Sequence, residues 1–98
     1  MSSDLLERND LRYAIFKNSF SLANNLLSTN LNLTDEYGNN AIILTILYNK
    51  KDLFLKILKN LNLDVDKKND VGLNALMISC ILGHEEYVNK LIEVNADV

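Results

Sequence analysis

The sequence predicts an all-α fold in which about three helix-turn-helix units stack side by side into a solenoid. Two observations carry this prediction: the chain repeats itself with a period of 33 to 34 residues, and apolar residues recur at helical spacing within each repeat. One such repeat cannot bury its own apolar face, so stacking is the expected way for 98 residues to build a core. We therefore treat residues 1–98 as one domain, with units at about 8–34, 35–68 and 69–98 and a degenerate first unit.

The second and third units align directly at their beginnings. Residues 35–44 (DEYGNNAIIL) correspond to residues 69–78 (NDVGLNALMI), which places Gly38 and Gly72 34 positions apart. Farther along, the spacing falls to 33, so the second unit holds one additional residue near 60–62.

Each unit is predicted to contain two short helices joined by a tight turn. Asn40 and Asn74 stand just before apolar runs and can cap the first free amides of a helix. Asn18, Asn49 and Gly83 can adopt the left-handed conformation that ends a helix. The predicted helices lie near 10–17, 21–28, 40–48, 52–60, 74–82 and 86–94, and hairpin-like turns are predicted near 32–38 and 65–72.

The turns and the second helices carry further signals. Gly38 and Gly72 are predicted to adopt a positive φ, which is costly for any residue with a Cβ. Apolar residues at helical spacing predict buried stripes on the second helices, namely Phe54 and Leu58, then Tyr87, Leu91 and Val94.

A period near 33 with Asp-x-x-Gly ahead of an apolar helix resembles the ankyrin repeat. Residues 83–92 (GHEEYVNKLI), followed by residues 95–98 (NADV), are similar to that family's Gly-His, Glu, Ile-Val, Leu-Leu and Gly-Ala-Asp-Val pattern. The resemblance extends over about residues 10–98. The family's Thr-Pro-Leu-His start is replaced by residues 40–43 (NAII) and 74–77 (NALM), so the histidine that usually ties neighbouring hairpins together is missing from both units.

The resemblance implies a module that recognises another protein and has no catalytic activity. In ankyrin proteins the hairpin tips and one side of each first helix form a concave surface that meets partners. The matching positions here are Glu36, Tyr37, Asn39, Leu47, Tyr48, Asp70, Val71, Leu73, Ile81 and Leu82. Seven of these are apolar or aromatic, and together on a surface they would be typical of an interface. The alternative is that some of them belong to the core.

Two versions of this function remain open. The chain is either a free-standing adaptor or inhibitor, or a targeting fragment of a larger enzyme or of a host-directed effector. A small enzyme is a weaker third hypothesis, because the carboxylates are dispersed and three glycines cannot form a phosphate-binding loop.

His84 and Cys80 are the only histidine and cysteine. A zinc ion takes three or four protein ligands, so this pair predicts no metal site and no cofactor. Cys80 stands where the family has a small buried alanine, which predicts a buried and inert thiol. His84 matches the family's Gly-His turn, where its role is structural.

Charge and composition narrow the class of partner. The net charge is −3, the pI is about 5.0, and the basic residues are scattered, which is atypical of a protein that binds nucleic acid or an anionic membrane. The single cysteine and the absence of a long apolar segment favour a soluble intracellular protein. The expected partner is therefore another protein.

The third unit has the pattern of an internal repeat rather than a terminal cap. Its two helices carry apolar residues on several sides, more than one neighbouring unit can cover. We expect either that the natural protein continues beyond Val98 or that another chain covers this surface, for instance by self-association.

Overall fold

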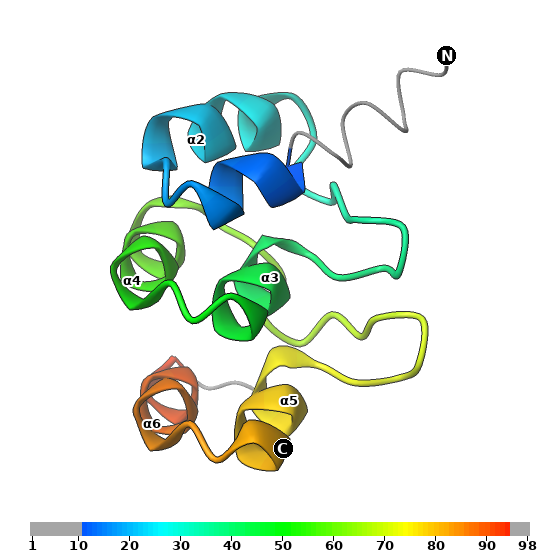
Figure 1. Cartoon of the computed structure of the whole chain (residues 1–98), viewed down its shortest axis with the longest axis vertical. Helices are drawn as coiled ribbons and strands as arrows, with labels where there is room; N and C mark the ends of the chain where they lie inside the picture. The colour runs from blue at the N-terminus through cyan, green and yellow to red at the C-terminus, as the bar shows by residue number, and fades with distance from the viewer. Residues whose placement is uncertain (1–10, 95–98) are drawn as a thin grey trace.

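The computed structural model describes residues 11–94, which form helices and turns with no strand in that range. Three helix pairs stack along the longest axis of a body that measures 38 × 27 × 20 Å (Figure 1). Residues 11–16 form a helix, and the others are α2 (Phe20–Thr29), α3 (Ala41–Leu47), α4 (Lys51–Asn60), α5 (Ala75–Leu82) and α6 (Glu85–Glu93). The predicted all-α class is confirmed, and the helix ends in 11–94 differ from the predicted ones by at most one residue.

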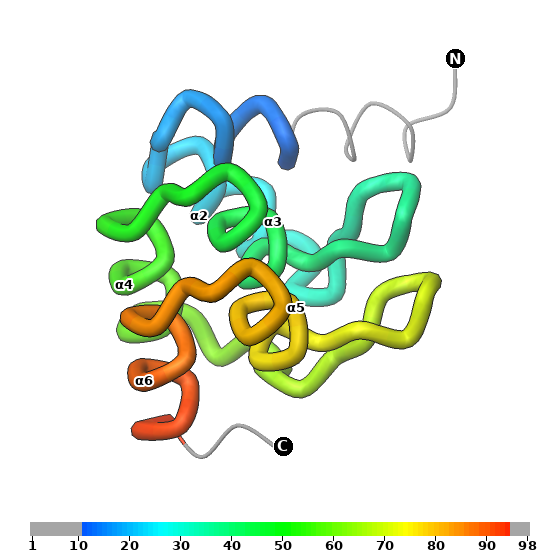
Figure 2. The backbone as a smooth tube through the Cα atoms, turned by 60° about the horizontal axis from the view of Figure 1, so that its bottom comes forward, coloured from blue at the N-terminus to red at the C-terminus, as the bar shows by residue number. Residues whose placement is uncertain are grey.

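The helices form two layers. Residues 11–16, α3 and α5 make an inner layer, while α2, α4 and α6 make an outer layer (Figures 1 and 2). The two hairpins project beyond the inner layer and lie side by side. Helix α3 packs against α4 of its own unit on the outer side and against α5 of the third unit on the downstream side.

Asparagine side chains cap the N-termini of α3 and α5, and left-handed residues follow the C-terminal ends of all three inner helices. The Oδ1 atoms of Asn40 and Asn74 accept hydrogen bonds of 3.0 and 2.9 Å from the backbone N–H groups three residues later, as predicted for N-caps. At the other ends, Asn18, Asn49 and Gly83 have φ values of 59°, 54° and 72°. All three predicted left-handed terminators are confirmed.

The core is continuous through the stack and is centred on α3, where six of the seven residues are buried. Phe54 of α4 and Tyr87 of α6 meet edge to face with their ring centroids 4.7 Å apart, which joins the two outer helices. The predicted stripe on α6 holds for Tyr87 and Leu91. The prediction is wrong for Val94, which follows the end of α6 as its C-cap and is exposed.

The prediction that Cys80 is buried is also wrong. Its equivalent in the second unit, Ile46, is completely buried because α5 packs against α3. In the range 11–94 no later helix packs on α5 in the same way, and the Cys80 side chain is exposed.

Candidate functional site

The first hairpin is folded around the buried carboxylate of Asp35. Its Oδ1 accepts hydrogen bonds of 2.9 Å from the backbone N–H groups of both Tyr37 and Asn39. Gly38 lies between them with φ of 80° and donates its N–H to the Asp35 carbonyl at 3.1 Å. A side chain that bonds its own backbone in this way fixes the shape of a turn.

The second hairpin repeats this arrangement with an amide in place of the carboxylate. Asn69 Oδ1 accepts hydrogen bonds from the backbone N–H groups of Val71 and Leu73 at 3.1 and 3.0 Å. Gly72 has φ of 84°, so the predicted positive φ is confirmed in both hairpins.

The two hairpins are bonded to each other. Asn69 Nδ2 donates to Asn39 Oδ1 at 2.9 Å, while Asn39 Nδ2 donates to Asp35 Oδ2 at 3.1 Å. The backbone N–H of Asp70 also donates to the carbonyl of Tyr37 at 3.0 Å. These bonds hold the hairpin tips in a fixed relative position without the histidine that the family uses.

The structure exposes some of the predicted tip residues and buries others. Tyr37 and Val71 are 63% and 77% exposed, and Asp70 is exposed beside them. Asn39 is only 6% exposed and its amide is bonded on both sides, so the expectation that it meets a partner is corrected: its role is structural. Leu73 is partly buried against the core.

Glu36 is the remaining tip residue. It is partly buried and forms an ion pair with Arg12 of the first unit. The pair connects the first inner helix to the hairpin of the second unit, so Glu36 already has a partner within the chain.

The predicted positions on the inner helices lie on the surface, in the last turns of α3 and α5. Leu47 and Tyr48 immediately precede the left-handed Asn49, and Ile81 and Leu82 precede Gly83 in the same way. All four are exposed, and Ile81 most of all at 69%.

Phe16 is absent from the predicted set, yet it occupies the equivalent place in the first unit. It precedes Asn18 by two residues, as Leu47 precedes Asn49, and it is 58% exposed. Its ring meets Tyr48 edge to face at 6.0 Å, and Lys50 Nζ lies 5.6 Å from its centroid. The spacing to Asn18 is the sequence signal that points to it. We call Phe16, Leu47, Tyr48, Ile81 and Leu82 the apolar ridge.

The hairpin tips and the apolar ridge are separate patches. The hairpins lead into the first residues of α3 and α5, whereas the ridge lies in the last turns of those helices (Figure 2). Seven residues of α-helix span roughly 10 Å, so a partner must be at least that wide to reach both patches.

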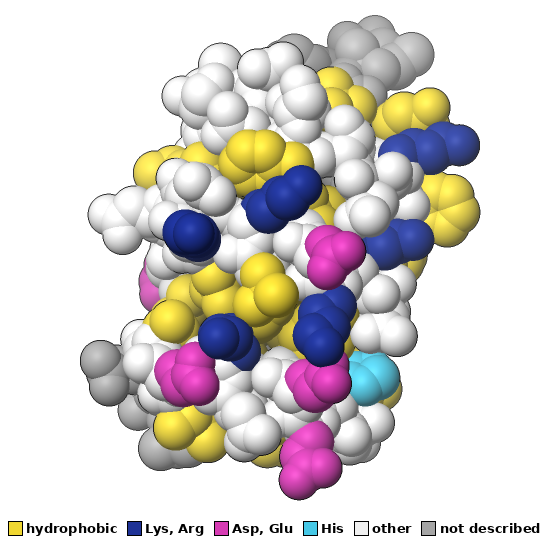
Figure 3. Space-filling view, turned by 90° about the vertical axis from the view of Figure 1, so that its left-hand side faces the viewer, with side chains coloured by type: hydrophobic (Ala, Val, Ile, Leu, Met, Phe, Trp, Pro, Cys, Tyr) yellow, Lys and Arg dark blue, Asp and Glu magenta, His cyan; other side chains and the backbone are white. Residues whose placement is uncertain are grey.

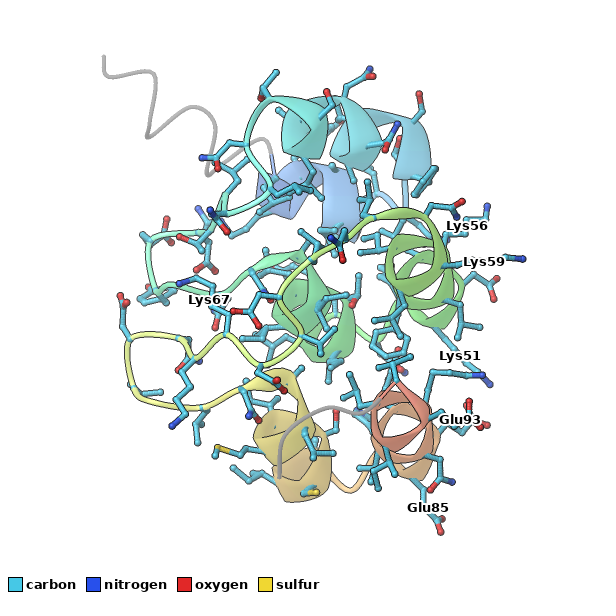
Figure 4. All side chains as sticks on the ribbon, turned by 180° about the vertical axis from the view of Figure 1, so that it is seen from behind. Lys51, Lys56, Lys59, Lys67, Glu85 and Glu93 are labelled. Atoms are coloured by element: carbon cyan, nitrogen blue, oxygen red, sulfur yellow. The ribbon has the colours of Figure 1, made fainter. Side chains whose placement is uncertain are left out.

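The outer face has a different character. A groove of about 380 Å³ lies between α4 and α6, with Phe54 and Leu55 among its lining residues and an ion pair between Lys51 and Glu86 across it. Figure 3 shows lysine and acidic side chains interspersed around apolar surface on this face. In Figure 4, Lys51, Lys59 and Glu93 project from the same two helices, far from Lys67 on the hairpin side. Most of the predicted partner residues lie elsewhere.

Tyr87 also lines this groove. Its hydroxyl donates to Asn49 Oδ1 at 3.0 Å and its ring packs on Phe54. Burial of the hydroxyl, and secondarily the negative charge of Glu86, raise the pKa of Tyr87 above its usual value of 10.0.

A second groove of about 380 Å³ lies on α5 and has no charged residue in its lining, which consists of Leu73, Leu76, Met77, Cys80 and Ile81. Cys80 and His84 belong to no group of three or more His, Cys, Asp or Glu that could hold a metal ion in the described residues. His84 begins α6 as its N-cap and meets Tyr87 edge to face at 5.5 Å.

Three further findings bear on the class of protein. The family model for ankyrin repeats, in three copies, matches residues 11–98. No protein among the curated sequences matches this chain. Within residues 11–94, none of the helices has the length and apolarity needed to cross a membrane.

Proposed function

The chain belongs to the ankyrin-repeat family, and we propose that it binds another protein through the apolar ridge, with the hairpin tips as a second contact. Ankyrin repeats are generally protein–protein interaction modules. The observation that carries the proposal is the exposure of large apolar side chains at the same place in three successive units. Such surfaces on soluble domains usually mark interfaces, and aromatic side chains supply much of the binding energy.

The proposed role is that of an intracellular adaptor or inhibitor without catalytic activity. A targeting segment of a larger enzyme or of a host-directed effector would use the same surface, so the binding proposal covers both. The contact set is Glu36, Tyr37, Asp70, Val71, Leu73 and the ridge, with Phe16 added and Asn39 removed. The units are proposed at 8–34, 35–68 and 69–98.

Capture of partners from the source cell tests the main proposal. The double variant Tyr48→Ala/Leu82→Glu should lose the partner that the wild type retains. The matched control is Tyr13→Ala/Leu31→Glu, which makes the same changes at two exposed positions outside the ridge. Equal capture by both variants, with the helical circular dichroism of the wild type, would exclude the ridge as the binding site.

A specific observation also favours self-association. The groove on α5 is lined only by apolar and sulfur-containing side chains, and Ile81, Leu82, Ile92 and Val94 of the third unit are all exposed. We therefore propose that copies of the chain associate through this unit, which removes apolar surface from water.

A further inference from the structure

The second unit shows what normally covers the downstream side of an inner helix. Ile43 and Ile46 of α3 are completely buried, and α5 packs against α3. Their equivalents one unit later are Met77, which is partly exposed, and Cys80, which is exposed. The same side of α5 therefore carries apolar groups that nothing in the described range covers.

The uncovered side continues onto the outer layer. Phe54 of α4 is buried, while its equivalent Val88 in α6 is partly exposed. Leu58 is partly buried, while its equivalent Ile92 is 53% exposed. We define the end face as Leu73, Met77, Cys80, Ile81, Val88 and Ile92.

The hairpin contributes to this face in an unusual way. Asn39 accepts a hydrogen bond from Asn69 of the next hairpin, but Leu73 stands at the place equivalent to Asn39. A further hairpin of the same kind would find no side-chain acceptor at Leu73. The end face thus lacks the side-chain part of the contact that joins the first two hairpins, and its groove presents apolar groups instead.

We propose that the end face binds the same face of a second copy, with α5 of one protomer against α5 of its partner around a two-fold axis. This geometry rests on the self-association proposed above. A two-fold axis brings like residues together, which is favourable only for a surface without net charge. Helix α5 contains no charged residue from Ala75 to Leu82, and neither does the groove on it.

The alternative head-to-tail contact is less complementary. It would place the end face against the upstream side of residues 11–16, where Tyr13 occupies the position equivalent to Ile78. Lys17 Nζ lies 5.7 Å from the centroid of that ring. A head-to-tail contact would therefore bring this ammonium group toward an apolar surface with no carboxylate in its groove, at a cost in desolvation.

The size of the end face indicates how tightly two copies of the chain should bind each other. The stack axis is the 38 Å dimension (Figure 1), so the two shorter dimensions of 27 and 20 Å give an end cross-section of about 540 Å². Stable complexes bury about 800 Å² per partner. The contact is below that size, and we expect a reversible dimer that forms with micromolar or weaker affinity.

Cys80 provides a direct test, because it is the only cysteine and lies within the end face. Sedimentation equilibrium of the full chain measures association, and a short bismaleimide cross-linker tests the geometry. We expect a reversible monomer–dimer equilibrium and a cross-linked dimer whose yield rises with protein concentration. The control variant Cys80→Ser/Val71→Cys moves the thiol to an exposed hairpin tip and should dimerise without efficient cross-linking.

A pair of charge substitutions tests the face itself. Met77→Glu/Ile92→Glu should raise the dimer dissociation constant about tenfold or more. The matched single variant Val71→Glu, at a more exposed apolar position outside the end face, should leave it unchanged. Helical circular dichroism confirms that each variant is folded.

The outcomes separate the proposals. A chain that stays monomeric at every concentration would overturn both self-association and this geometry. Association without Cys80 cross-linking, or growth into species larger than a dimer, would overturn the two-fold contact alone. Ile81 belongs to both the ridge and the end face, so ridge binding is measured separately, by partner capture with substitutions at Tyr48 and Leu82, which lie outside the end face.

Discussion

The side-chain amide of Asn69 donates a 2.9 Å hydrogen bond to Asn39 Oδ1, and this bond joins the hairpins of two successive units. Asn39 in turn donates to Asp35, so one chain of polar side chains runs from the first turn into the second. Asn39 and Asp35 are buried, which makes the chain sensitive to the loss of any member.

Replacement of Asn39 by alanine should destabilise the fold by about 1–3 kcal/mol, because the Asn69 amide and one Asp35 oxygen both lose a partner. Urea denaturation followed by circular dichroism measures the change. The control is Asn62→Ala, at an exposed position in the connection after α4. A loss no greater than that of the control would show that the hairpins are held by backbone contacts alone.

The two hairpin glycines should differ in their tolerance of alanine. A Cβ at Gly38 would lie 2.5 Å from Asp70 Oδ1 and 3.0 Å from its backbone nitrogen, whereas a Cβ at Gly72 would meet nothing within 4 Å. Both have a positive φ, so Gly72→Ala should cost about 1–2 kcal/mol and Gly38→Ala clearly more. Unfolding free energies of both variants provide the comparison.

A second background refines this test. In Asp70→Ala the carboxylate clash disappears but the close backbone nitrogen remains. In that background, the amount by which Gly38→Ala destabilises the fold more than Gly72→Ala should therefore become smaller but not reach zero. If this difference between the two glycine variants did not change, crowding against the backbone of Asp70 would account for all of it.

The cap residue Asn40 should be sensitive to aspartate. Its Oδ1 accepts from the Ile43 N–H, a bond that a carboxylate also makes. Its Nδ2, however, donates to the Asp64 carbonyl at 3.1 Å. Asn40→Asp should lose this second bond and place a carboxylate against a carbonyl oxygen, at a cost of about 1–3 kcal/mol. Thermal melts of Asn40→Asp and of Asn62→Asp, a control at an exposed position, would reveal equal losses if the Asp64 contact were unimportant.

The raised pKa of Tyr87 predicts a loss of stability in alkali. Burial of the hydroxyl favours its protonated form in the folded state, so the stabilisation is complete below the unfolded pKa of 10.0. It is lost as the pH rises from that value through the higher folded pKa. The unfolding free energy should fall more steeply above pH 10.0 in the wild type than in Tyr87→Phe. Lysine deprotonation affects both proteins, so parallel curves would contradict the assignment.

The helices and their ends could be predicted from local signals. Asn18, Asn49 and Gly83 each end a helix at the place where the repeat alignment puts them, because a left-handed residue acts on its own turn. The positive φ of the two hairpin glycines could likewise be predicted, because it depends on the conformation of a single residue.

The candidate site was only partly predictable, because burial depends on neighbouring units. The resemblance places Asn39 on the partner-facing surface, and its burial follows from an amide on the next hairpin, 30 residues away. Cys80 was expected to be covered, but its exposure depends on what packs downstream of α5. Phe16 was absent from the predicted partner residues because the first unit retains little of the repeat pattern. Its separation of two residues from Asn18 nevertheless matches that of Leu47 from Asn49.

The burial of α3 has a consequence for how the chain opens. Six of its seven side chains are enclosed by units on both sides, so α3 cannot unravel while its neighbours stay folded. The third unit rests on one described neighbour, so it can detach while α3 stays packed against α4, although its loss uncovers the side of α3 that α5 covers. Backbone amides should therefore exchange with deuterium fastest in α5 and α6, whereas the amides of α3 should exchange only through global unfolding. The opening free energy of the α3 amides should then equal the global free energy of unfolding. A partner bound across the ridge would slow exchange most in the third unit, because that unit opens most easily in the free chain.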